Sequence, residues 1–540
     1  MAEEKIIKHG SSTQNEIIEG VVAAVDAIKT TLGPSGKCVA ITNTYGDPTV
    51  TRDGATVSKS ISFKDPLKNM GATLVKTAST KTEEKAGDGT SSTALLIKEM
   101  VLKGQKAINT GSNVNEIKSG MLKAEKWMLD YIKTNSTPIE DDLEKIRKVA
   151  TISANNDPEI GNLIVECMEK VGKDSVITAE YSNGLDTTVD ITQGLVINRG
   201  WSSPQFITSP NDGKCVMENP YIIVIGEKLS SVNQILPLMN QVIPTGRPFL
   251  FVVDDIDAVV ETTLIMNCLQ GNIRTCVVKG IDFGDNRKNT MMDIAVFTGG
   301  NYICPETGKE VTQITLEDLG GASKVVVSRE NCIIYEGYGD PQEIKDRVDI
   351  LKNNLADPNC SDYDKTKFTK RIANLSGGIG IIRAGGISEV ERANRKATIE
   401  DAILASKSAL EEGCVCGGGY IYYKGSLDVQ KDKAFWKSLT GDEKEGAEII
   451  FTSLPIIMKT VAENSGVSGD IVLEKVKTMK PGIGYNAKTE KYSDLIEDGV
   501  LDSAKVLRSA LENAISTASM ILLIDCTVTE DITEDSLEKK

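Results

Sequence analysis

The chain has 540 residues and a formal net charge of −16 at pH 7, with 61 Lys and Arg residues against 77 Asp and Glu residues. Its length predicts about three domains, and its acidic balance, without a basic stripe interleaved with aromatic residues, argues against nucleic acid as a partner. No apolar run reaches the ~18 residues that a membrane-spanning helix needs, and the start MAEEKIIKHG has the features of neither a secretory signal nor a transit peptide. We therefore expect a multidomain cytoplasmic protein with no membrane partner.

The chain contains a single histidine, His9, and 11 cysteines without paired spacing. A single histidine argues against zinc sites built on histidine and against Ser/His/Asp or Cys/His nucleophile systems. An odd number of scattered cysteines fits buried thiols in a reducing compartment better than a disulfide framework. Any catalysis is therefore expected to depend on carboxylates.

The first section of the chain is predicted to be mainly helical. Apolar residues recur at helical spacing from Gln14 to Leu32, and further helices are expected from about Asn69 to Ala86 and from Thr90 to Lys103. Two short strand-like stretches, Lys37 to Thr42 and Thr49 to Thr51, lie between the first two helices.

The stretch from Ala86 to Ser92 is a glycine–aspartate–glycine turn that runs into hydroxyl residues and a helix. Gly87 and Gly89 have no Cβ, so their backbone N–H groups can approach a ligand closely. The hydroxyl residues 90–92 lie where unpaired helix N–H groups collect, which suits an anionic phosphate, and Asp88 is placed to hold a magnesium ion on that phosphate. The stretch has no P-loop lysine, and alone it is more typical of an ordinary capped turn than of a ligand site.

The middle of the chain has the pattern of a compact α/β domain. Strand-length apolar runs alternate with helical stretches in a β-α-β-α-β rhythm, which predicts a largely parallel sheet. The strands are Tyr221 to Ile225, Phe249 to Asp254 and Thr275 to Val278, and the helices are Val232 to Val242 and Ala258 to Leu269.

After this domain the chain is predicted to return to helices. Asp340 to Asn374 indicates a helical hairpin, and a short strand lies between the glycine pairs that begin at Gly377 and end at Gly386. From Arg392 the pattern is mainly helical as far as Met520. The charged tail, residues 529–540, is expected to be disordered.

Seven candidate ligand-binding pieces resemble, in order and spacing, the group I chaperonins of the GroEL family. The resemblance covers about Gly20 to Val528, and the combination of T-L-G-P-x-G with G-D-G-T-[ST]-[ST] is specific. The pieces are Thr31-Leu32-Gly33-Pro34-Ser35-Gly36, Arg52-Asp53-Gly54, Gly87 to Ser92, Ile152-Ser153-Ala154-Asn155, Glu400-Asp401-Ala402, Gly417-Gly418-Gly419 and Gly484-Tyr485-Asn486-Ala487.

This resemblance implies a multidomain α and α/β fold, the chaperonin fold. Residues 1–136 and 412–540 would form a mainly helical equatorial ATP-binding domain. Residues 137–193 and 376–411 would form a small intermediate hinge domain, and residues 194–375 an α/β apical domain that binds substrate.

The resemblance also implies an ATP-hydrolysing site. Asp88 would hold magnesium, while Asp53 and Asp401 would position and activate the attacking water, because phosphoryl transfer needs charge neutralisation and an in-line water. For Asp401 alone, a solvated helix face is the alternative. The nucleotide contacts would come from Thr31, Leu32, Gly33, Pro34, Arg52, Gly54, Gly87, Asp88, Gly89, Thr90, Ser91, Ser92, Ile152, Ser153, Gly418, Asn486, Ala487 and Asp502.

The cofactors that the resemblance implies are ATP, Mg²⁺ and K⁺, and the assembly is a heptameric homo-oligomeric ring. Non-native polypeptide clients, and a small co-chaperonin if one is used, would bind an exposed apolar strip of the apical domain. Its members would be Trp201, Phe206, Leu236, Met239, Ile265 and Met266.

The chain departs from the family pattern at several positions. Gln205 and Glu261 stand in the apical strip where apolar residues are usual, so the client range and the use of a co-chaperonin stay open. Arg52 replaces a usual lysine, and Lys488 replaces a small residue beside the adenine pocket. The end of the chain also lacks the family's Gly-Gly-Met repeat.

Two functions from different classes remain. The first is a ring that captures non-native protein and promotes its folding by encapsulation and release driven by ATP. The alternative is a holdase or scaffold ring whose ATP use is slow or uncoupled from folding. Asp53, Asp88 and Asp401 favour the first, because a holdase has no need for a hydrolytic set.

Overall fold

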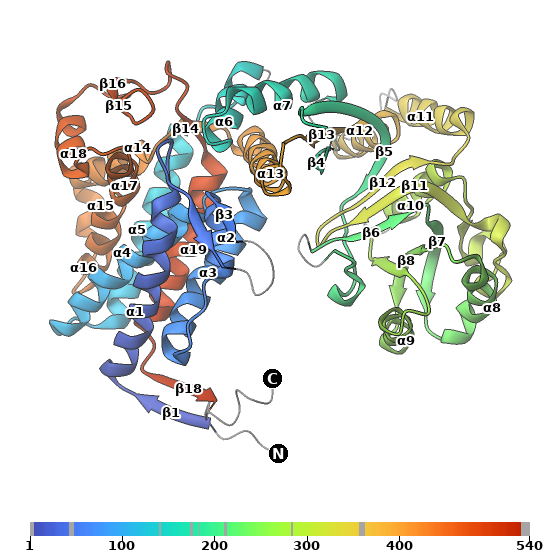
Figure 1. Cartoon of the computed structure of the whole chain (residues 1–540), viewed down its shortest axis with the longest axis horizontal. Coiled ribbons are helices and arrows are strands. Elements are labelled where there is room, and N and C mark those ends of the chain that lie inside the picture. Colours follow the sequence, from blue (N-terminus) through green and yellow to red (C-terminus); the bar gives the residue numbers. More distant parts are fainter. Residues whose placement is uncertain are drawn as a thin grey trace. The chain divides into compact units, whose positions relative to one another are not determined.

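A computed structural model describes residues 5–42, 48–139, 142–172, 176–182, 184–209, 213–281, 285–355 and 362–530. The chain forms two compact units (Figure 1). The first comprises Met1–Val165, Ala179–Thr188 and Ile382–Lys540, and the second comprises Glu166–Thr178 and Val189–Ile381. The expected division into three domains, with its boundaries, stays a prediction.

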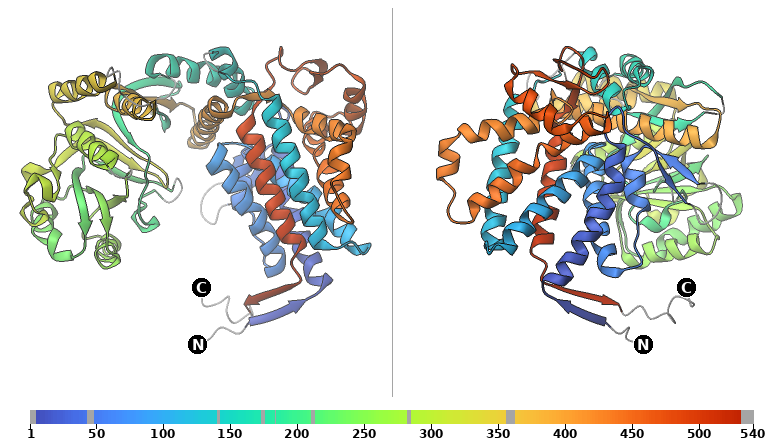
Figure 2. Two further views of the ribbon diagram at one scale, coloured as in Figure 1. Left: turned by 180° about the vertical axis from the view of Figure 1, so that it is seen from behind. Right: turned by 60° about the vertical axis from the view of Figure 1, so that its left-hand side comes forward.

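The first unit is built around long helices whose apolar faces share one core. In α1 (Ser11–Ile28) the residues Ile17, Val21 and Val25 follow helical spacing and are fully buried. They join apolar residues of α3 (Pro66–Ala86), α4 (Thr90–Asn109), α5 (Val114–Asn135), α16 (Glu443–Ser453) and α19 (Ala504–Leu522). The last of these, drawn in red in Figure 2, packs against α3, α4 and α5.

Two glycines let α1 and α3 approach backbone to backbone. A Cβ added at Gly20 would lie 2.0 Å from the Lys68 carbonyl oxygen, and one added at Gly71 would lie 2.0 Å from the Ile17 carbonyl oxygen. Only glycine fits at either position, because the obstacle is backbone that cannot rotate away. The pair sets the spacing of the two helices that support the pocket described below.

Shorter elements complete the first unit. Its remaining helices are α2 (Gly54–Ser60), α6 (Leu143–Ser153), α7 (Pro158–Val171, which continues into the second unit), α13 (Glu389–Glu412), α14 (Tyr420–Asp428), α15 (Lys433–Lys437), α17 (Ile456–Asn464) and α18 (Gly469–Thr478). Its small sheets pair β1 (Lys5–His9) with β18 (Cys526–Glu530), β2 (Val39–Ile41) with β3 (Thr49–Thr51), β14 (Cys414–Cys416) with β17 (Leu501–Ser503) and β15 (Ile483–Asn486) with β16 (Lys491–Asp494).

The β1–β18 pair corrects one expectation. Thr529 and Glu530 belong to β18 and pair with Ile6 and Lys5, so the predicted disordered tail does not begin at residue 529. Backbone hydrogen bonds to β1 order these residues, a long-range pairing that local composition does not reveal. Residues 531–540 lie outside the described part of the chain.

The second unit contains the predicted α/β domain. Strands β7 (Tyr221–Leu229), β8 (Phe249–Ile256) and β9 (Thr275–Lys279) are parallel neighbours, connected by α8 (Val232–Val242) and α9 (Ala258–Leu269). Phe249 to Val253 are at most 2% exposed. Strands of a parallel sheet that is covered on both faces are buried on both sides, which is why their sequence is a continuous apolar run. The β-α-β-α-β prediction is confirmed, with both helices at the predicted bounds. The expectation of a largely parallel sheet is wrong, because the sheet that contains these strands also has several antiparallel pairs.

In the described residues these strands belong to a ten-stranded mixed sheet. Its order is β4-β13-β5-β12-β11-β7-β8-β9, with β10 beside β7 and β6 beside β11. The additional elements are β4 (Ile177–Tyr181), β5 (Thr188–Ile197), β6 (Cys215–Glu218), β10 (Tyr302–Ile303), β11 (Gly320–Val327), β12 (Cys332–Gly337), β13 (Gly378–Ala384), α10 (Asp285–Thr298), α11 (Pro341–Leu355) and α12 (Asp362–Ser376). The predicted helical hairpin is the α11–α12 pair.

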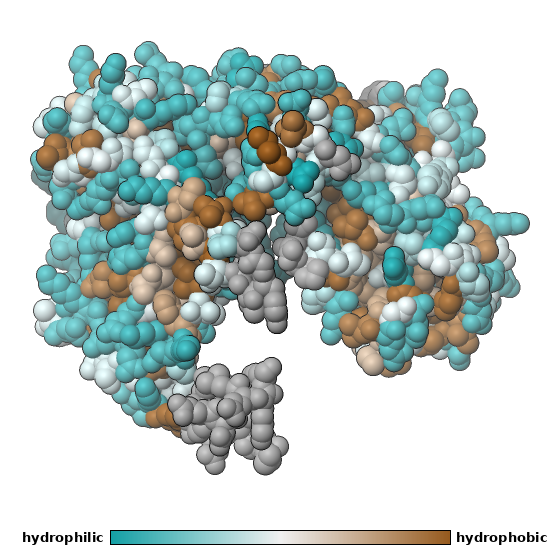
Figure 3. Space-filling view, viewed as in Figure 1, coloured by the Kyte–Doolittle hydropathy of each residue, from teal (hydrophilic) through white to brown (hydrophobic). Residues whose placement is uncertain are grey.

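The expected client strip is only partly exposed. Leu236 and Met266 are 47% and 49% exposed, on α8 and α9, and Figure 3 shows hydrophobic residues gathered over these helices. Phe206, Met239 and Ile265 are instead buried in the core of the second unit. The expectation of exposure is wrong for these three. Met239 and Ile265 lie on the sides of α8 and α9 that face the core, and Phe206 ends a short 3-10 turn that packs on the same core.

The remaining member of the strip, Trp201, is half-buried against the same core. Its indole Nε1 donates to the Gly213 carbonyl oxygen at 3.3 Å.

Ten cysteines in the described residues are free thiols, and seven of them are buried. Buried thiols were expected from the sequence, and these seven confirm that expectation. In the same part of the chain no helix is both long and apolar enough to cross a membrane.

A buried carboxylate joins three helices of the second unit and provides a test of this packing. Asp293 on α10 accepts from Arg347 Nε at 2.8 Å, and from Arg371 Nε at 2.6 Å and Nη2 at 2.8 Å. We predict that Asp293→Asn destabilises this region by about 3 kcal/mol, because both guanidinium groups lose a shared charged acceptor. Hydrogen–deuterium exchange of the full chain should then rise in α10, α11 and α12.

The matched control is Asp349→Asn on α11. Asp349 is 55% exposed and 3.8 Å from Lys352, so exchange should hardly change. Equal effects of the two substitutions would contradict this account of α10–α12.

Candidate functional site

One pocket of about 220 Å³ in the first unit brings together every residue expected to touch nucleotide, as well as Asp53 and Asp401. These residues come from segments as far apart as residues 31–34 and 486–502. The structure thus assembles the whole predicted set around a single cavity.

The glycine–aspartate–glycine turn forms the floor of the pocket. Gly87 ends α3 with φ of 79°, and Gly89 precedes α4 with φ of 92°, a left-handed conformation that residues with a Cβ rarely adopt. No described side chain caps α4, and its first turn has no acidic residue. Its first N–H groups are therefore left for a ligand, and the helix dipole makes this end attractive to an anion.

A second helix begins beside it. Asp53 caps α2, accepting from the backbone N–H groups of Ala55 at 3.0 Å and Thr56 at 2.7 Å, and from Thr56 Oγ1 at 2.6 Å. A Cβ on Gly54 would lie 2.2 Å from Ser91 Oγ, so the first residues of α2 and α4 are in close contact. The capping bonds hold the Asp53 carboxylate in place at the pocket wall.

Arg52 anchors the turn at Gly33 and Pro34. Its Nη2 donates to the carbonyl oxygens of both residues, at 2.7 Å for Pro34, and burial lowers the pKa of the guanidinium. Asn464 Nδ2 donates to the Leu32 carbonyl oxygen at 2.8 Å from the other side. This turn is therefore held from two directions, and the arginine that departs from the family pattern has a structural role.

Carboxylates crowd the pocket. Burial raises the pKa of Asp88, and burial together with the negative charges of Asp53 and Asp88 raises the pKa of Asp401 well above its ordinary value. Burial and Asp88 also raise the pKa of Asp502 to about 7. These carboxylates repel one another, so a bound cation would relieve the repulsion.

Within the described residues, no group of three or more His, Cys, Asp or Glu side chains could hold a metal ion by itself. A magnesium ion at Asp88 would therefore need ligands from a bound phosphate, which is how magnesium is usually held. The uncapped start of α4 beside Asp88 is a suitable place for that phosphate. The residues present thus fit a magnesium–phosphate pair.

The opposite end of the pocket is formed by two small sheets. On β17, Asp502 accepts from the Gly418 backbone N–H at 3.1 Å. The Asn486 side chain donates to Asp498 Oδ2 at 2.8 Å and accepts from the Lys488 backbone N–H at 3.0 Å, so it is engaged within its own hairpin. Ala487 is also buried here.

Helix α13 carries Asp401 into the pocket and is packed tightly on the glycine turn. A Cβ on Gly87 would lie 1.9 Å from Leu404 Cβ, and Ser408 Oγ donates to the Ala86 carbonyl oxygen at 2.9 Å. Asp401 and Asp88 therefore line the same pocket, because α13 packs directly on the glycine turn that contains Asp88.

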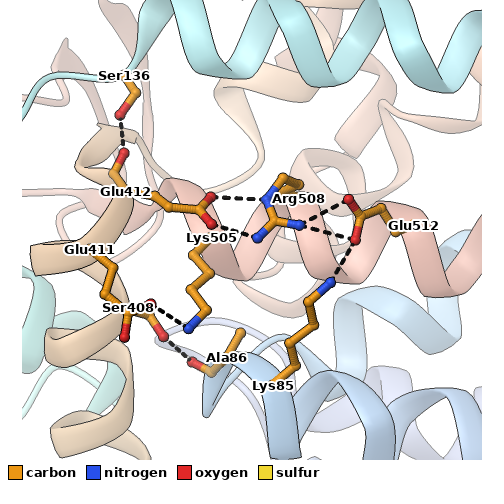
Figure 4. A network of polar contacts seen from close by, with 9 residues as sticks. All are labelled: Lys85, Ala86, Ser136, Ser408, Glu411, Glu412, Lys505, Arg508 and Glu512. Carbon is orange, nitrogen blue, oxygen red and sulfur yellow. Dashed lines mark hydrogen bonds and ion pairs between the residues drawn. The ribbon is translucent and has the colours of Figure 1, made fainter. Parts of the chain in front are cut away.

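A network of charged side chains fastens the end of α13 to α19 (Figure 4). Arg508 Nε donates to Glu412 Oε2 at 2.9 Å, and Nη1 donates to Glu512 Oε1 at 2.9 Å. Lys505 pairs with Glu411 at 2.6 Å, and Lys85 of α3 pairs with Glu512 at 2.8 Å. The network links the helix that bears Asp401 to the helix that ends at the glycine turn.

Some pocket residues were not predicted from the sequence. Glu83, Thr398 and Asn156 line the cavity, as do Ile457 and Val461 of α17. Glu83 and Thr398 lie one helical turn before Gly87 and Asp401, so helical periodicity could have indicated them. The apolar pair on α17 carries no sequence signal, because buried apolar residues are equally typical of a core.

Glu125 provides a test of the electrostatics beside the Arg508 network. Burial and the charge of Glu512 raise the pKa of the Glu125 carboxyl to about 7, so the folded state favours the protonated form. The stability that this form provides is complete below the ordinary pKa and is lost as the pH rises toward about 7. We predict that, between about pH 6 and about pH 8, the free energy of unfolding of the wild type falls by about 1 kcal/mol more than that of Glu125→Gln.

Urea unfolding at both pH values measures this difference. Asp130→Asn, an exposed change on the same helix, should leave the pH dependence of the wild type intact. A Glu125→Gln variant with unchanged pH dependence would contradict the raised pKa.

Comparison with known proteins adds two findings. Residues 25–531 match the model of the TCP-1/cpn60 chaperonin family. The fold is similar to that of the chaperonin gp146 from the bacteriophage EL 2 (Pseudomonas aeruginosa), whose crystal form II was studied in the presence of ATP-BeFx. The TM-score is 0.70 at 20% identity, over 98% of this chain and 100% of that chain.

Proposed function

The chain belongs to the TCP-1/cpn60 chaperonin family, and from this premise we propose that it is an ATP-dependent, ring-forming chaperone of the group I type. In this proposal the chain hydrolyses ATP and uses the cycle to bind, enclose and release non-native polypeptides. The observation that carries the ATPase part is the convergence of an uncapped helix start and several repelling carboxylates in one pocket.

The phosphates of ATP would lie at the start of α4. The backbone N–H groups and hydroxyls of Thr90, Ser91 and Ser92 are the donors for them, and Gly87 and Gly89 allow the close approach. The turn at Gly33 and Pro34, held by Arg52, would close the other side of the phosphates.

Asp88 would hold magnesium together with phosphate oxygens. When bound, the ion neutralises phosphate charge and polarises the phosphoryl group. Ser153 Oγ donates to Asp88 Oδ2 at 3.0 Å and keeps the carboxylate turned into the pocket. Potassium stays a prediction of the family resemblance.

Asp53 and Asp401 would orient the attacking water and accept its proton. The α2 N–H groups donate to the Asp53 side chain and hold it in place at the pocket. The raised pKa of Asp401 suits a proton acceptor, because a stronger base takes the proton more readily. Two carboxylates held by different helices can therefore divide the work of orienting and deprotonating water.

The adenosine end would bind between the two small sheets. Gly418 and Ala487 offer backbone and methyl surface, while Asp502 can accept from a ribose hydroxyl. Because the Asn486 side chain is engaged with Asp498, its contact with the nucleotide is proposed to come from its backbone and the outer face of its amide.

Clients would bind the exposed apolar residues of α8 and α9. Leu236 and Met266 from the predicted strip remain in this proposal, together with Val259 and Leu269, which are 73% and 65% exposed. An exposed apolar surface on two neighbouring helices is typical of a protein-binding site. A heptameric homo-oligomeric ring, a co-chaperonin and the three-domain division are proposed from the family resemblance.

The first test concerns hydrolysis. We predict that Asp401→Asn keeps ATP binding but lowers turnover by about 100-fold or more, because the proton acceptor is lost while the phosphate contacts remain. Phosphate release measures turnover, and binding of a fluorescent ATP analogue measures affinity.

Glu391→Gln is the matched control, since Glu391 lies exposed in the first turn of the same helix, outside the pocket. Unchanged turnover of Asp401→Asn would overturn the assignment of Asp401.

The second test concerns folding. We predict that the wild-type chain raises the refolding yield of a denatured enzyme when ATP is present, and that Leu236→Ser combined with Met266→Ser abolishes this gain without lowering ATP turnover. Each assay is run with and without a co-chaperonin. A chain that only suppresses aggregation, equally with and without ATP, would instead be the holdase or scaffold alternative.

A further inference from the structure

The end of α6 and the turn after it cover one side of the pocket. Four residues of the segment 152–156 line the cavity, and Ser153 contacts Asp88 at the phosphate end. Asn155 and Asn156 both have positive φ, 55° and 65°, and the Asn156 N–H donates to the Thr151 carbonyl oxygen at 2.8 Å. The turn is thus tightly wound, and the Asn156 carbonyl is available to a donor outside the segment.

That donor is Lys488. Its Nζ donates to the Asn156 carbonyl oxygen at 3.2 Å, across a sequence separation of 332 residues. Lys488 follows Asn486 and Ala487 on the turn after β15, and it also lines the pocket. Its ammonium group lies at the C-terminal end of α6, where helix carbonyls carry partial negative charge and attract cations.

The body of α6 has a separate attachment to the same region. Lys148 Nζ donates to the carbonyl oxygens of Ile496 at 3.2 Å and Glu497 at 3.4 Å. Lys148 lies near the middle of the helix, outside the pocket lining, whereas Lys488 contacts the segment that covers the pocket. The contact from Lys488 therefore acts on the covering segment itself.

The segment is held differently at its two ends. The Ser153–Asp88 bond involves the carboxylate that is proposed to bind magnesium. Binding of nucleotide and magnesium would therefore change the surroundings of this bond. The Lys488–Asn156 bond joins a lysine to a backbone carbonyl and involves no group assigned to the phosphates. It can therefore hold the segment whether or not the phosphate end is occupied.

We propose that Lys488 is a positioning residue that latches segment 152–156 over the adenosine end of the pocket and thereby slows nucleotide release. The part concerning release rests on the proposed function, because it assumes that ATP occupies this cavity. The latch itself is a property of the chain without ligand. Two measurements separate these parts.

The first measurement is hydrogen–deuterium exchange of the ligand-free full-length chain. In Lys488→Ala, residues 151–157 should exchange faster, because one of the contacts that hold the segment is gone. Lys488→Arg keeps a cationic donor and should restore most of the protection. Lys491→Ala removes an exposed lysine from the partner strand β16 and should leave exchange of the segment unchanged.

The second measurement is dissociation of a fluorescent ADP analogue, followed by stopped flow. Lys488→Ala should release the analogue about threefold to tenfold faster than the wild type, the loss expected for one ordinary hydrogen bond, because the Lys488–Asn156 bond is exposed to solvent. Lys488→Arg should be close to the wild type, and Lys491→Ala should equal it.

The outcomes are distinct. Unchanged exchange in Lys488→Ala, or an equal increase in Lys491→Ala, overturns the latch. If Lys488→Ala speeds hydrogen–deuterium exchange of residues 151–157 but leaves the release rate of the ADP analogue unchanged, the proposal that the latch slows nucleotide release is overturned. A wild-type chain that binds no analogue overturns the proposed function and the release step, while the exchange measurement still decides the latch.

Discussion

The mutual repulsion of carboxylates in a half-buried pocket is the constraint on which the site depends. Asp88, Asp401 and Asp502 all have raised pKa values, first because of burial and then because of other negative charges, among which Asp53 and Asp88 recur. Such a group of acids is unfavourable unless a cation or proton compensates it. The surrounding fold holds these side chains close together despite their repulsion. Helices α2, α4 and α13 are the elements that support them.

The supports are themselves positioned by contacts that tolerate little change. Helix α13 lies so close to Gly87 that a Cβ would overlap with Leu404, and the end of α13 is fastened to α19 by Arg508. The helix that ends at the glycine turn is tied to the same network through Lys85. A shift of α13 would therefore displace both Asp401 and the glycine turn. This gives a physical route by which nucleotide state and helix position can be coupled.

The second unit follows a different principle. Its parallel strands are buried on both faces, and α8 and α9 bury one apolar side while exposing another. Exposed apolar residues therefore lie on a well-packed support rather than on a loop. Composition alone does not separate the two sides, because Met239 and Met266 are the same residue type and differ only in which way the helix turns them.

The sequence by itself was sufficient for most local elements and, through the family resemblance, for many of the residues that line the pocket. Helical periodicity, β-branched runs and glycine turns are local signals, so α8 and α9 were predicted at their observed bounds, and the family motif indicated Gly87 to Ser92 and Asp401. Only the tertiary structure decided what depends on distant contacts. The pairing of Thr529 with β1, the burial of Phe206, the presence of Ile457 in the pocket and the contact of Lys488 with Asn156 all join segments that no local pattern relates. Packing and backbone hydrogen bonds between such segments have no sequence period, which is why they could not be predicted.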